Sequence, residues 1–410
     1  RKTDVILPMH KGKQLDNDLN RTNNLTNTLI DPLSKEPDFK YTCVAIEKYK
    51  KPTEKIVVVG AGAAAFRFIQ NYREINTQDE IVVFSNEKNP FYNRVLLPEY
   101  VTAELSWEQL LKIKEEALAK LNITLQSEVA INQISTDEKK ITDSNGVIHH
   151  YDTLILATGS RPFVPENAQL HLPGRFTIRK KDDADRLRNY LEQTQLPPEE
   201  QHVVIVGGGL LGLELAAALK HKKVKITIIQ RASRLMERQL DRISSKLLAE
   251  EVQQRDIQIY FDNEVSTVFS TNRAHELEIA LKSGRTLTAN AIVYTIGTIP
   301  NIEVAKEAGL TCARGVKVNQ YLQSSNPSIF AIGEIAEFNN QLFGITSAAE
   351  EQADILANYL AGDISSHYKG SVLMNILKLE DINLCSIGEI EVPENDDSYE
   401  EIVFSDLGKR

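Results

Sequence analysis

The sequence predicts an α/β protein with two separate parallel-sheet units. The first observation is a pair of apolar, β-branched runs that end in glycine, KIVVVG at 55–60 and HVVIVGGG at 202–209. Continuous apolar runs of this kind are typical of strands buried on both faces of a parallel sheet. The second observation is that strand-like and helix-like segments alternate along the chain, as in βαβ units with right-handed crossovers. The repeated strand–glycine–helix order therefore indicates a duplicated architecture.

The other elements of the two units follow from local patterns, taken in chain order. In the first unit, residues 77–85 and 151–160 have the apolar pattern of strands, and residues 106–122 have helical spacing. In the second unit the same patterns predict two helices and two strands, in the order helix 210–223, strand 224–230, helix 243–255 and strand 256–261.

Composition places the chain among folded proteins and excludes several partners. Of its 410 residues, 42% are hydrophobic and 25% charged, which are near globular averages. With 47 basic and 57 acidic residues the net charge is -10, which disfavours nucleic acid and anionic membrane surfaces as partners. No run is long and apolar enough to predict a membrane span, and no secretory signal is visible.

The three cysteines are sparse and far apart. Cys43, Cys312 and Cys385 form no CxxC pair and no metal-ligand spacing, so no metal site is predicted and a reducing cytoplasm is the expected location. The chain begins with Arg1 rather than Met, and we expect it to be a piece of a longer polypeptide.

The first unit carries a glycine turn whose spacing suits a dinucleotide phosphate. Gly60, Gly62 and Ala65 form the pattern G-x-G-x-x-A after a strand and at the start of a helix. The first glycine allows a tight turn, the second lets the backbone approach a pyrophosphate, and the small third residue allows close helix–sheet packing. The phosphates then lie at the helix N-terminus. Taken alone, the turn is also compatible with a simple connection between strand and helix.

The second unit repeats the pattern in the same context. Gly207, Gly209 and Gly212 follow the strand VVIV and open a helical stretch. Two independent matches in one chain are hard to attribute to chance. The sequence therefore predicts two Rossmann-like dinucleotide-binding domains.

The residues that follow the second strand of each unit bear on the ribose contacts of the dinucleotide. Glu87 is the candidate acid in the first unit, its alternative being an ordinary loop glutamate. In the second unit Gln230 occupies the position, followed by Arg231 and Arg234. An amide beside arginines removes the carboxylate that would repel a 2'-phosphate, so NADPH is permitted. Alternatively, these arginines are solvated surface charges.

Further motifs resemble those of flavoprotein reductases with two dinucleotide domains, a fold similar to that of glutathione reductase. They are ATGSRP at 157–162, GGGLLGLE at 207–214, TIGTIPN at 295–301 and AIGE at 331–334. The resemblance implies FAD in the first unit and NAD(P)H in the second, with the NAD(P) domain inserted in the FAD domain.

The same resemblance assigns roles to residues in these motifs. Thr158 and Gly159 would approach the FAD, Glu334 would take the place of the usual aspartate on the ribityl chain, and Gly297 would contact a cofactor. Glu214 would lie near the nicotinamide and is the candidate catalytic residue. For Thr158 and Glu214 the structural alternatives are a plain strand end and a helix glutamate.

More specific sequence motifs resemble those of the large subunit of assimilatory NAD(P)H nitrite reductases and of flavin modules of assimilatory nitrate reductases. These motifs are PFYNRVLLPEY at 90–100, RLMERQLD at 234–241, RGVKVN at 314–319 and the glutamate of AIGE. The resemblance places Arg94 near the FAD, the alternative being a surface arginine.

The amino-terminal segment, 1–52, resembles the end of a molybdopterin-dinucleotide-binding domain. LPMHKG at 7–12 and DPLSKEPDFK at 31–40 carry this likeness, which makes His10, Asn24 and Lys40 candidate pterin contacts. The alternative is a linker broken by prolines. Together with the flavin module, the segment suggests a fusion of nitrate reductase with its electron-input domain.

The order of the motifs predicts the domain organisation. The FAD domain is expected at 54–165 plus 285–365, the NAD(P)H domain at 166–284, and the start of a truncated, β-rich third domain at 366–410. In the family that last region often packs beside the flavin or between subunits, so a homodimer is a further expectation.

The predicted function is hydride transfer from NAD(P)H to FAD, followed by single-electron transfer. Because no cysteine falls in the first glycine helix or in the 88–98 loop, a thiol relay is excluded. The acceptor is then an iron–sulfur, rubredoxin-like, siroheme or molybdenum centre on missing sequence or on a partner protein. The alternatives are a free-standing NAD(P)H:rubredoxin or ferredoxin reductase and a noncatalytic flavin-binding scaffold.

Overall fold

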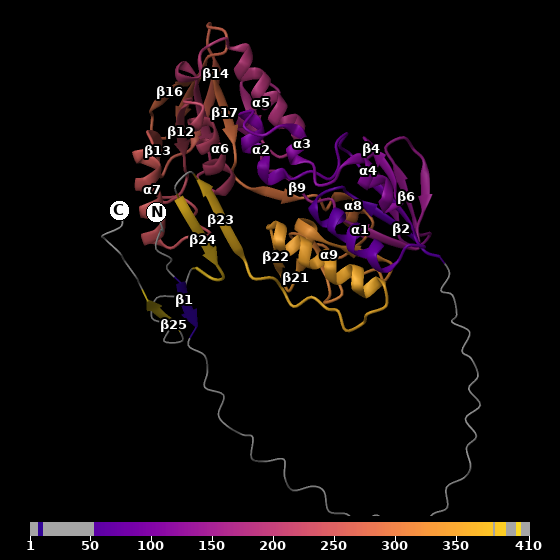
Figure 1. The fold of residues 1–410 in the computed structure, drawn as a ribbon. Coiled ribbons are helices and arrows are strands. Elements are labelled where there is room, and N and C mark those ends of the chain that lie inside the picture. The colour runs from indigo at the N-terminus through magenta and orange to yellow at the C-terminus, as the bar shows by residue number, and fades with distance from the viewer. Residues whose placement is uncertain (1–6, 11–52, 380–381, 391–398, 403–410) are drawn as a thin grey trace, which may run out of the picture.

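The computed structural model describes residues 7–10, 53–379, 382–390 and 399–402. Two α/β units lie side by side and are joined by crossing chain segments near β9 (Figure 1). Of the candidate pterin contacts, Asn24 and Lys40 lie outside the described residues, and only the backbone position of His10, in strand β1 (Leu7–His10), is described.

The first unit is built on a parallel sheet of five strands in the order β20-β8-β2-β3-β4. Alternate residues of β2 serve the two faces, because Ile56 and Val58 belong to one apolar core and Val57 and Val59 to another. The strands are β2 (Lys55–Val59), β3 (Glu80–Ser85), β4 (Thr124–Ser127), β8 (Thr153–Leu156) and β20 (Ile329–Ala331).

Helices cover one face of this sheet and a small antiparallel sheet covers the other. On the first face α1 (Ala63–Ile75) packs lengthwise against α9 (Thr346–Leu360) (Figure 1). The opposite face carries α8 (Glu303–Glu307) and three strands, namely β5 (Ile131–Ser135), β6 (Lys140–Asp143) and β7 (Ile148–His150). The first unit also contains a smaller sheet of β19 (Val316–Val318), β21 (Ala336–Phe338) and β22 (Gln341–Leu342).

The second unit has the same plan, with the parallel order β10-β17-β11-β12-β13. Its strands are β10 (Arg175–Thr177), β11 (His202–Val206), β12 (Lys225–Ile229), β13 (Ile257–Tyr260) and β17 (Ala291–Tyr294). One face is covered by α5 (Lys181–Gln193), α6 (Leu210–His221) and α7 (Arg242–Gln254). The other is covered by β14 (Val265–Ser270), β15 (Leu277–Leu281) and β16 (Thr286–Ala289).

The two crossings between the units pair with each other. β9 (Ser160–Pro162) leaves the first unit and β18 (Thr298–Pro300) returns to it, and they form an antiparallel pair. Strand β16 pairs with β15 and strand β17 pairs with β11, so β16 and β17 belong to the second unit. The chain therefore returns to the first unit after β17, later than the expected position at residue 285.

The segment 106–122, whose spacing is helical, does not form one continuous helix. The chain instead forms α3 (Trp107–Leu110) and α4 (Glu115–Leu118), separated by extended backbone at Leu111 that bridges to Tyr92. The reason is that Leu110 packs in the core of the second unit, whereas Ile113 packs against that of the first.

Part of the first unit therefore packs on the second. Tyr92 and helix α2 (Leu97–Val101) share an apolar core with α5 and α6. Helix α2 lies beside α5 in Figure 1.

The strands expected after residue 366 are present as a hairpin of β23 (Met374–Leu379) and β24 (Ile382–Ile387). Leu377, Leu379 and Ile382 join the core of the second unit, where β23 contacts α6. β1 pairs with β25 (Tyr399–Ile402). No helix in the described part of the chain is both long and apolar enough to span a bilayer.

Candidate functional site

One cleft of about 1400 Å³ runs between the two units and holds nearly all the predicted site residues. That volume exceeds the roughly 300–1000 Å³ of a pocket for one small ligand, so it has room for two large ones. Of the residues predicted for the FAD and NAD(P)H sites, all but Ala65, Gly212 and Arg234 line it: Gly60, Gly62, Glu87, Arg94, Thr158, Gly159, Gly207, Gly209, Glu214, Gln230, Arg231, Gly297 and Glu334.

The glycine turn of the first unit brings backbone, not side chains, to the cleft. Gly60 has φ +110°, and a Cβ there would lie 2.1 Å from the carbonyl oxygen of Ala157. A residue with a side chain would therefore be strained and would clash with the backbone of Ala157, which follows β8. At Gly62 an added Cβ would meet no described atom within 4 Å. The space beside Gly62 is thus open, as close approach of a ligand to this backbone requires.

The second turn reproduces these relations. Gly207 has φ +114°, and a Cβ there would lie 2.7 Å from the carbonyl oxygen of Thr295. At Gly212 a Cβ would lie 2.1 Å from the carbonyl oxygen of Gly207, so the helix packs directly on the turn. An added Cβ at Gly209 would again meet no described atom within 4 Å.

The first turns of α1 and α6 both face the cleft with free N–H groups. Their N-cap residues are Gly62 and Gly209, which have no side chain with which to cap the helix. Neither helix has an acidic residue in its first turn. Unpaired N–H groups and the positive end of the helix dipole favour an anion at both positions. The residues present thus fit the phosphates of two dinucleotides.

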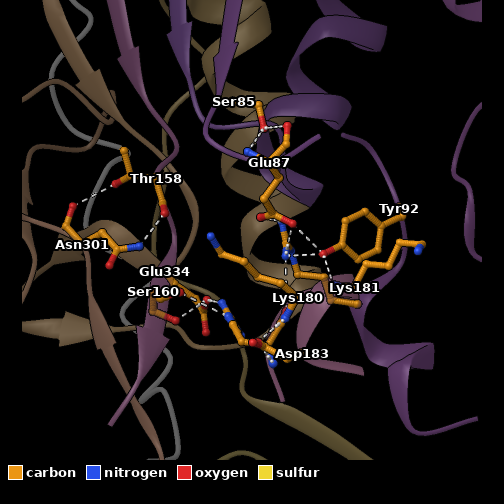
Figure 2. A network of polar contacts seen from close by, with 12 residues as sticks. Ser85, Glu87, Tyr92, Thr158, Ser160, Lys180, Lys181, Asp183, Asn301 and Glu334 are labelled. Atoms are coloured by element: carbon orange, nitrogen blue, oxygen red, sulfur yellow. Dashed lines mark hydrogen bonds and ion pairs between the residues drawn. The ribbon is translucent and has the colours of Figure 1, made fainter. Parts of the chain in front are cut away.

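At the end of β3, Glu87 lies in a dense polar network (Figure 2). Its carboxylate accepts hydrogen bonds from the Arg94 guanidinium at 2.7 and 3.3 Å and from the Tyr92 hydroxyl at 2.8 Å. Burial raises the pKa of Tyr92 well above its ordinary value, so this hydroxyl stays protonated. These contacts hold the Glu87 side chain in one place, and the Arg94 guanidinium balances its charge.

At the end of β12, Gln230 holds the second glycine turn. Its Oε1 accepts a hydrogen bond from the Gly208 N–H at 2.8 Å, and its Nε2 donates to the Arg234 carbonyl at 3.1 Å and towards Glu237 at 3.5 Å. The Nε2 atom must donate in both contacts, and a carboxylate cannot. Arg231, which follows, is exposed at the cleft.

The two crossings meet at the ATG turn. Thr158 Oγ1 donates to the Asn301 carbonyl at 2.9 Å, and Asn301 Nδ2 donates to the Thr158 carbonyl at 2.9 Å (Figure 2). Beside this turn Glu334 accepts a hydrogen bond from Ser160 Oγ at 2.8 Å and pairs with the guanidinium of Arg179. Glu334 is thus placed beside Gly159 and is neutralised by an arginine from the start of the second unit.

The side chains that line the cleft include an acid of the second unit but neither of the described cysteines. Glu214 is on α6 and lines the cleft in the second unit. Neither of the described cysteines, Cys312 and Cys385, lines it, and Cys43 lies outside the described residues. Within the described ranges, no cluster of His, Cys, Asp and Glu is arranged to hold a metal ion.

Sequence reasoning missed four residues of the site: Tyr92, Ser160, Arg179 and Asn301. Ser160 and Asn301 lie inside the ATGSRP and TIGTIPN runs, so their motifs pointed to them. For Arg179 the sequence gives no signal, because its partner Glu334 is 155 positions away.

Comparison with known proteins gives consistent similarities. Residues 54–353 match the model of the pyridine nucleotide-disulphide oxidoreductase family. The chain is 31% identical over 342 residues to the assimilatory nitrate reductase electron transfer subunit of Bacillus subtilis, covering 83% of this chain and 43% of that protein. It is 30% identical over 344 residues to the NAD(P)H nitrite reductase of Bacillus subtilis, covering 83% and 42%. The chain thus spans less than half the length of these relatives.

Among solved structures, a ferredoxin reductase from Rhodopseudomonas palustris is similar with a TM-score of 0.76 and 26% identity, over 82% of this chain and 83% of that one. The covalent complex of putidaredoxin reductase with putidaredoxin is similar with a TM-score of 0.76 and 25% identity, over 82% and 81%.

Proposed function

The chain belongs to the pyridine nucleotide-disulphide oxidoreductase family, and from that premise we propose that it is the electron-input module of an assimilatory nitrate or nitrite reductase. It is an FAD-dependent NAD(P)H oxidoreductase, and in this role it passes electrons singly to a metal centre. The observation that carries the proposal is the shared cleft into which two uncapped glycine turns open from opposite units.

In this proposal the first unit holds FAD. Gly60 and Gly62 take its pyrophosphate, Glu87 and Arg94 lie at the ribose and phosphate side, and the turn at Thr158 and Gly159 approaches it with Glu334. The second unit holds NAD(P)H through the turn that includes Gly207, Gly209 and Gly212, with Gln230 and Arg231 at the adenosine end. Glu214 and Gly297 lie towards the nicotinamide.

The bound flavin supplies the redox chemistry, because it accepts a hydride and can give up electrons one at a time. The protein binds, orients and balances charge. Glu87 is paired with Arg94 and Glu334 with Arg179, so neither acid adds an unbalanced negative charge beside an anionic cofactor.

The electron acceptor is proposed to be a metal centre outside the described residues. The cysteines of the described residues do not reach the cleft, which supports transfer to a separate iron–sulfur, rubredoxin-like, siroheme or molybdenum centre. The names of the two Bacillus subtilis relatives favour nitrate or nitrite as the final oxidant. Action in the cytoplasm and assembly as a homodimer are further parts of this proposal.

A second candidate is a reductase that serves a free ferredoxin or rubredoxin. It is favoured by the similarity of the fold to a ferredoxin reductase, with a TM-score of 0.76 and 26% identity. The two intact glycine turns weigh against the third possibility, a noncatalytic scaffold.

The nicotinamide donor is proposed to include NADPH. Gln230 is an amide whose Nε2 atom donates to backbone and carboxylate oxygens, so the position carries no charge that would repel a 2'-phosphate. Arg231 and Arg238 line the cleft close by, although Glu237 and Glu264 line it as well.

The test is an anaerobic titration of the FAD-loaded chain with NADPH and, separately, with NADH, following the flavin absorbance band. Bleaching supports the input-module proposal and identifies the donor. A bound flavin that neither nucleotide reduces contradicts it. The reduced chain is then mixed with a ferredoxin, a rubredoxin and a molybdenum-containing nitrate reductase subunit. Reoxidation by the last alone supports the nitrate assignment, and reoxidation by the carriers alone supports the second candidate.

A further inference from the structure

The hydroxyl of Tyr92, a residue of the first unit, forms hydrogen bonds with residues of both units. It donates to Glu87 at 2.8 Å, and it accepts from Arg94 at 2.7 Å and from the backbone N–H of Lys181 at 3.1 Å (Figure 2). One donor and two acceptor positions are all that a phenol oxygen offers. The side chain is 2% exposed, so water does not compete for these positions.

Its partner on the second unit is the first turn of α5. The side chain of Asp183 accepts the N–H groups of Arg179 and Lys180, and Tyr92 takes the next one, that of Lys181. The first N–H groups of a helix have no partner within the helix. The start of α5 is therefore capped jointly, by its own Asp183 and by a residue of the first unit.

The connection continues through the cleft to the second acid of the predicted FAD site. Arg94 donates to the Arg179 carbonyl at 3.3 Å, and the Arg179 side chain pairs with Glu334. Residues 179–181 thus lie between the network of Glu87 and that of Glu334. Any shift of the start of α5 must disturb both.

A second tyrosine of the first unit forms a hydrogen bond with the same helix but does not contact Glu87. Tyr100 donates to Asp185 at 2.8 Å, and Lys181 also pairs with Asp185 at 2.6 Å. Tyr100 and Tyr92 both pack against Trp107. Of these two interdomain tyrosines, only Tyr92 reaches the predicted ribose acid.

We infer that Tyr92 is a positioning residue that couples the two dinucleotide sites. This rests on the proposed function, in which Glu87 and Arg94 serve FAD and the second unit serves the nicotinamide nucleotide. FAD that holds Glu87 and Arg94 in place also holds the Tyr92 hydroxyl, and this hydroxyl fixes the start of α5. By reciprocity, a nucleotide that fixes the second unit raises the affinity for FAD by the same factor.

The experiment measures this factor. The FAD dissociation constant of the chain, stripped of flavin, is determined with and without saturating NADP+, or NAD+ if NADH is the donor. We expect the nucleotide to tighten FAD binding on the order of tenfold in the unaltered chain, within the usual range of coupling between sites. Tyr92→Phe keeps the ring but removes all three hydrogen bonds. The factor should therefore lose most of its size, and the hydrogen bond from Arg94 to the Arg179 carbonyl should preserve only a small remainder.

Two matched variants separate coupling from general loosening. Tyr100→Phe breaks the interdomain contact that does not reach Glu87 and should keep most of the factor. Tyr151→Phe removes a buried hydroxyl that has no hydrogen-bond partner among the described residues, and should leave the factor unchanged. A second readout is hydrogen exchange of the Lys181 amide, which FAD should slow in the unaltered chain and in Tyr100→Phe, but not in Tyr92→Phe.

A factor of one in the unaltered chain, an undiminished factor in Tyr92→Phe, or an equal loss in Tyr100→Phe would each overturn the inference. These results differ from failure of the proposed function, which would be a chain that binds no FAD or whose bound FAD is not reduced.

Discussion

The two glycines at the start of α1 should give opposite results when they are replaced, because one meets protein and the other meets open space. At Gly60, φ is +110° and an added Cβ would lie 2.1 Å from the Ala157 carbonyl oxygen. The left-handed backbone alone costs an alanine about 1–2 kcal/mol. The overlap must also be relieved by moving β2 or β8, so Gly60→Ala should lower the free energy of unfolding by about 2–4 kcal/mol.

Gly62→Ser should leave stability intact and weaken cofactor binding. Gly62 has extended backbone, φ -89° and ψ -165°, which any residue adopts, and its Cβ would meet no described atom within 4 Å. A serine supplies the side-chain cap that α1 lacks, which is worth a few tenths of a kcal/mol over glycine. The same hydroxyl occupies the space beside the turn and competes for the N–H groups of the first turn. We expect FAD affinity to fall at least about tenfold, a loss of about 1.4 kcal/mol.

The assay pairs urea unfolding of the flavin-free chain with titration of FAD by flavin fluorescence, for both variants and the unaltered chain. Gly60→Ala should move the unfolding midpoint, and Gly62→Ser should move only the dissociation constant. If Gly62→Ser binds FAD as tightly as the unaltered chain, the first glycine turn is not the phosphate site and the cofactor assignment of the first unit is refuted.

Three further outcomes are expected from the same contacts. Gln230→Glu places a charge at the adenosine end and loses the donation to the Arg234 carbonyl, so the ratio of kcat/KM for NADPH over NADH should drop about tenfold; an unchanged ratio would mean that this position does not face the nucleotide. Arg179→Met leaves Glu334 without its cation and should increase the rate of FAD release, measured by dilution. Arg179→Lys keeps a cation and should increase that rate less. Burial lowers the pKa of His202 below its ordinary value of 6.5, so the folded chain resists protonation while the unfolded chain accepts it. Stability should therefore be full above pH 6.5 and decline as pH falls below it, and His202→Gln should flatten this part of an unfolding-midpoint profile; an equally steep profile in the variant would contradict it.

The glycine turns could be predicted from sequence because their causes are local. A strand, a residue with positive φ at Gly60 or Gly207, and a helix lie within a few positions of one another, so the pattern carries the geometry. The polar network could not be predicted in this way. Tyr92 meets Lys181 across 89 positions and Arg179 meets Glu334 across 155, and no local pattern reports such a meeting.

The failed helix and the misplaced boundary have a related cause. Helical spacing over 106–122 is real, but Leu110 and Ile113 belong to cores of different units, and a single straight helix cannot serve both. The return to the first domain was predicted at residue 285, whereas β17 completes the second sheet beside β11. Periodicity identifies which residues are buried, but only the assembled fold decides in which core they lie.

The chain has a net charge of -10. The cleft can still accept two anionic ligands, because the acids at the predicted cofactor positions are either paired with arginines or replaced by an amide. The two acids of the predicted FAD site are balanced, because Glu87 pairs with Arg94 and Glu334 pairs with Arg179. At the corresponding position of the second unit Gln230 takes the place of an acid altogether. The phosphates are then attracted by helix N-termini rather than by an excess of cations, and this attraction is confined to the first turn. If the arginines serve mainly to balance the acids, removing Arg94 alone leaves the Glu87 charge without its partner. Removing Arg94 should therefore lower FAD affinity more than removing Glu87 and Arg94 together. A double-mutant cycle on FAD affinity would measure that difference.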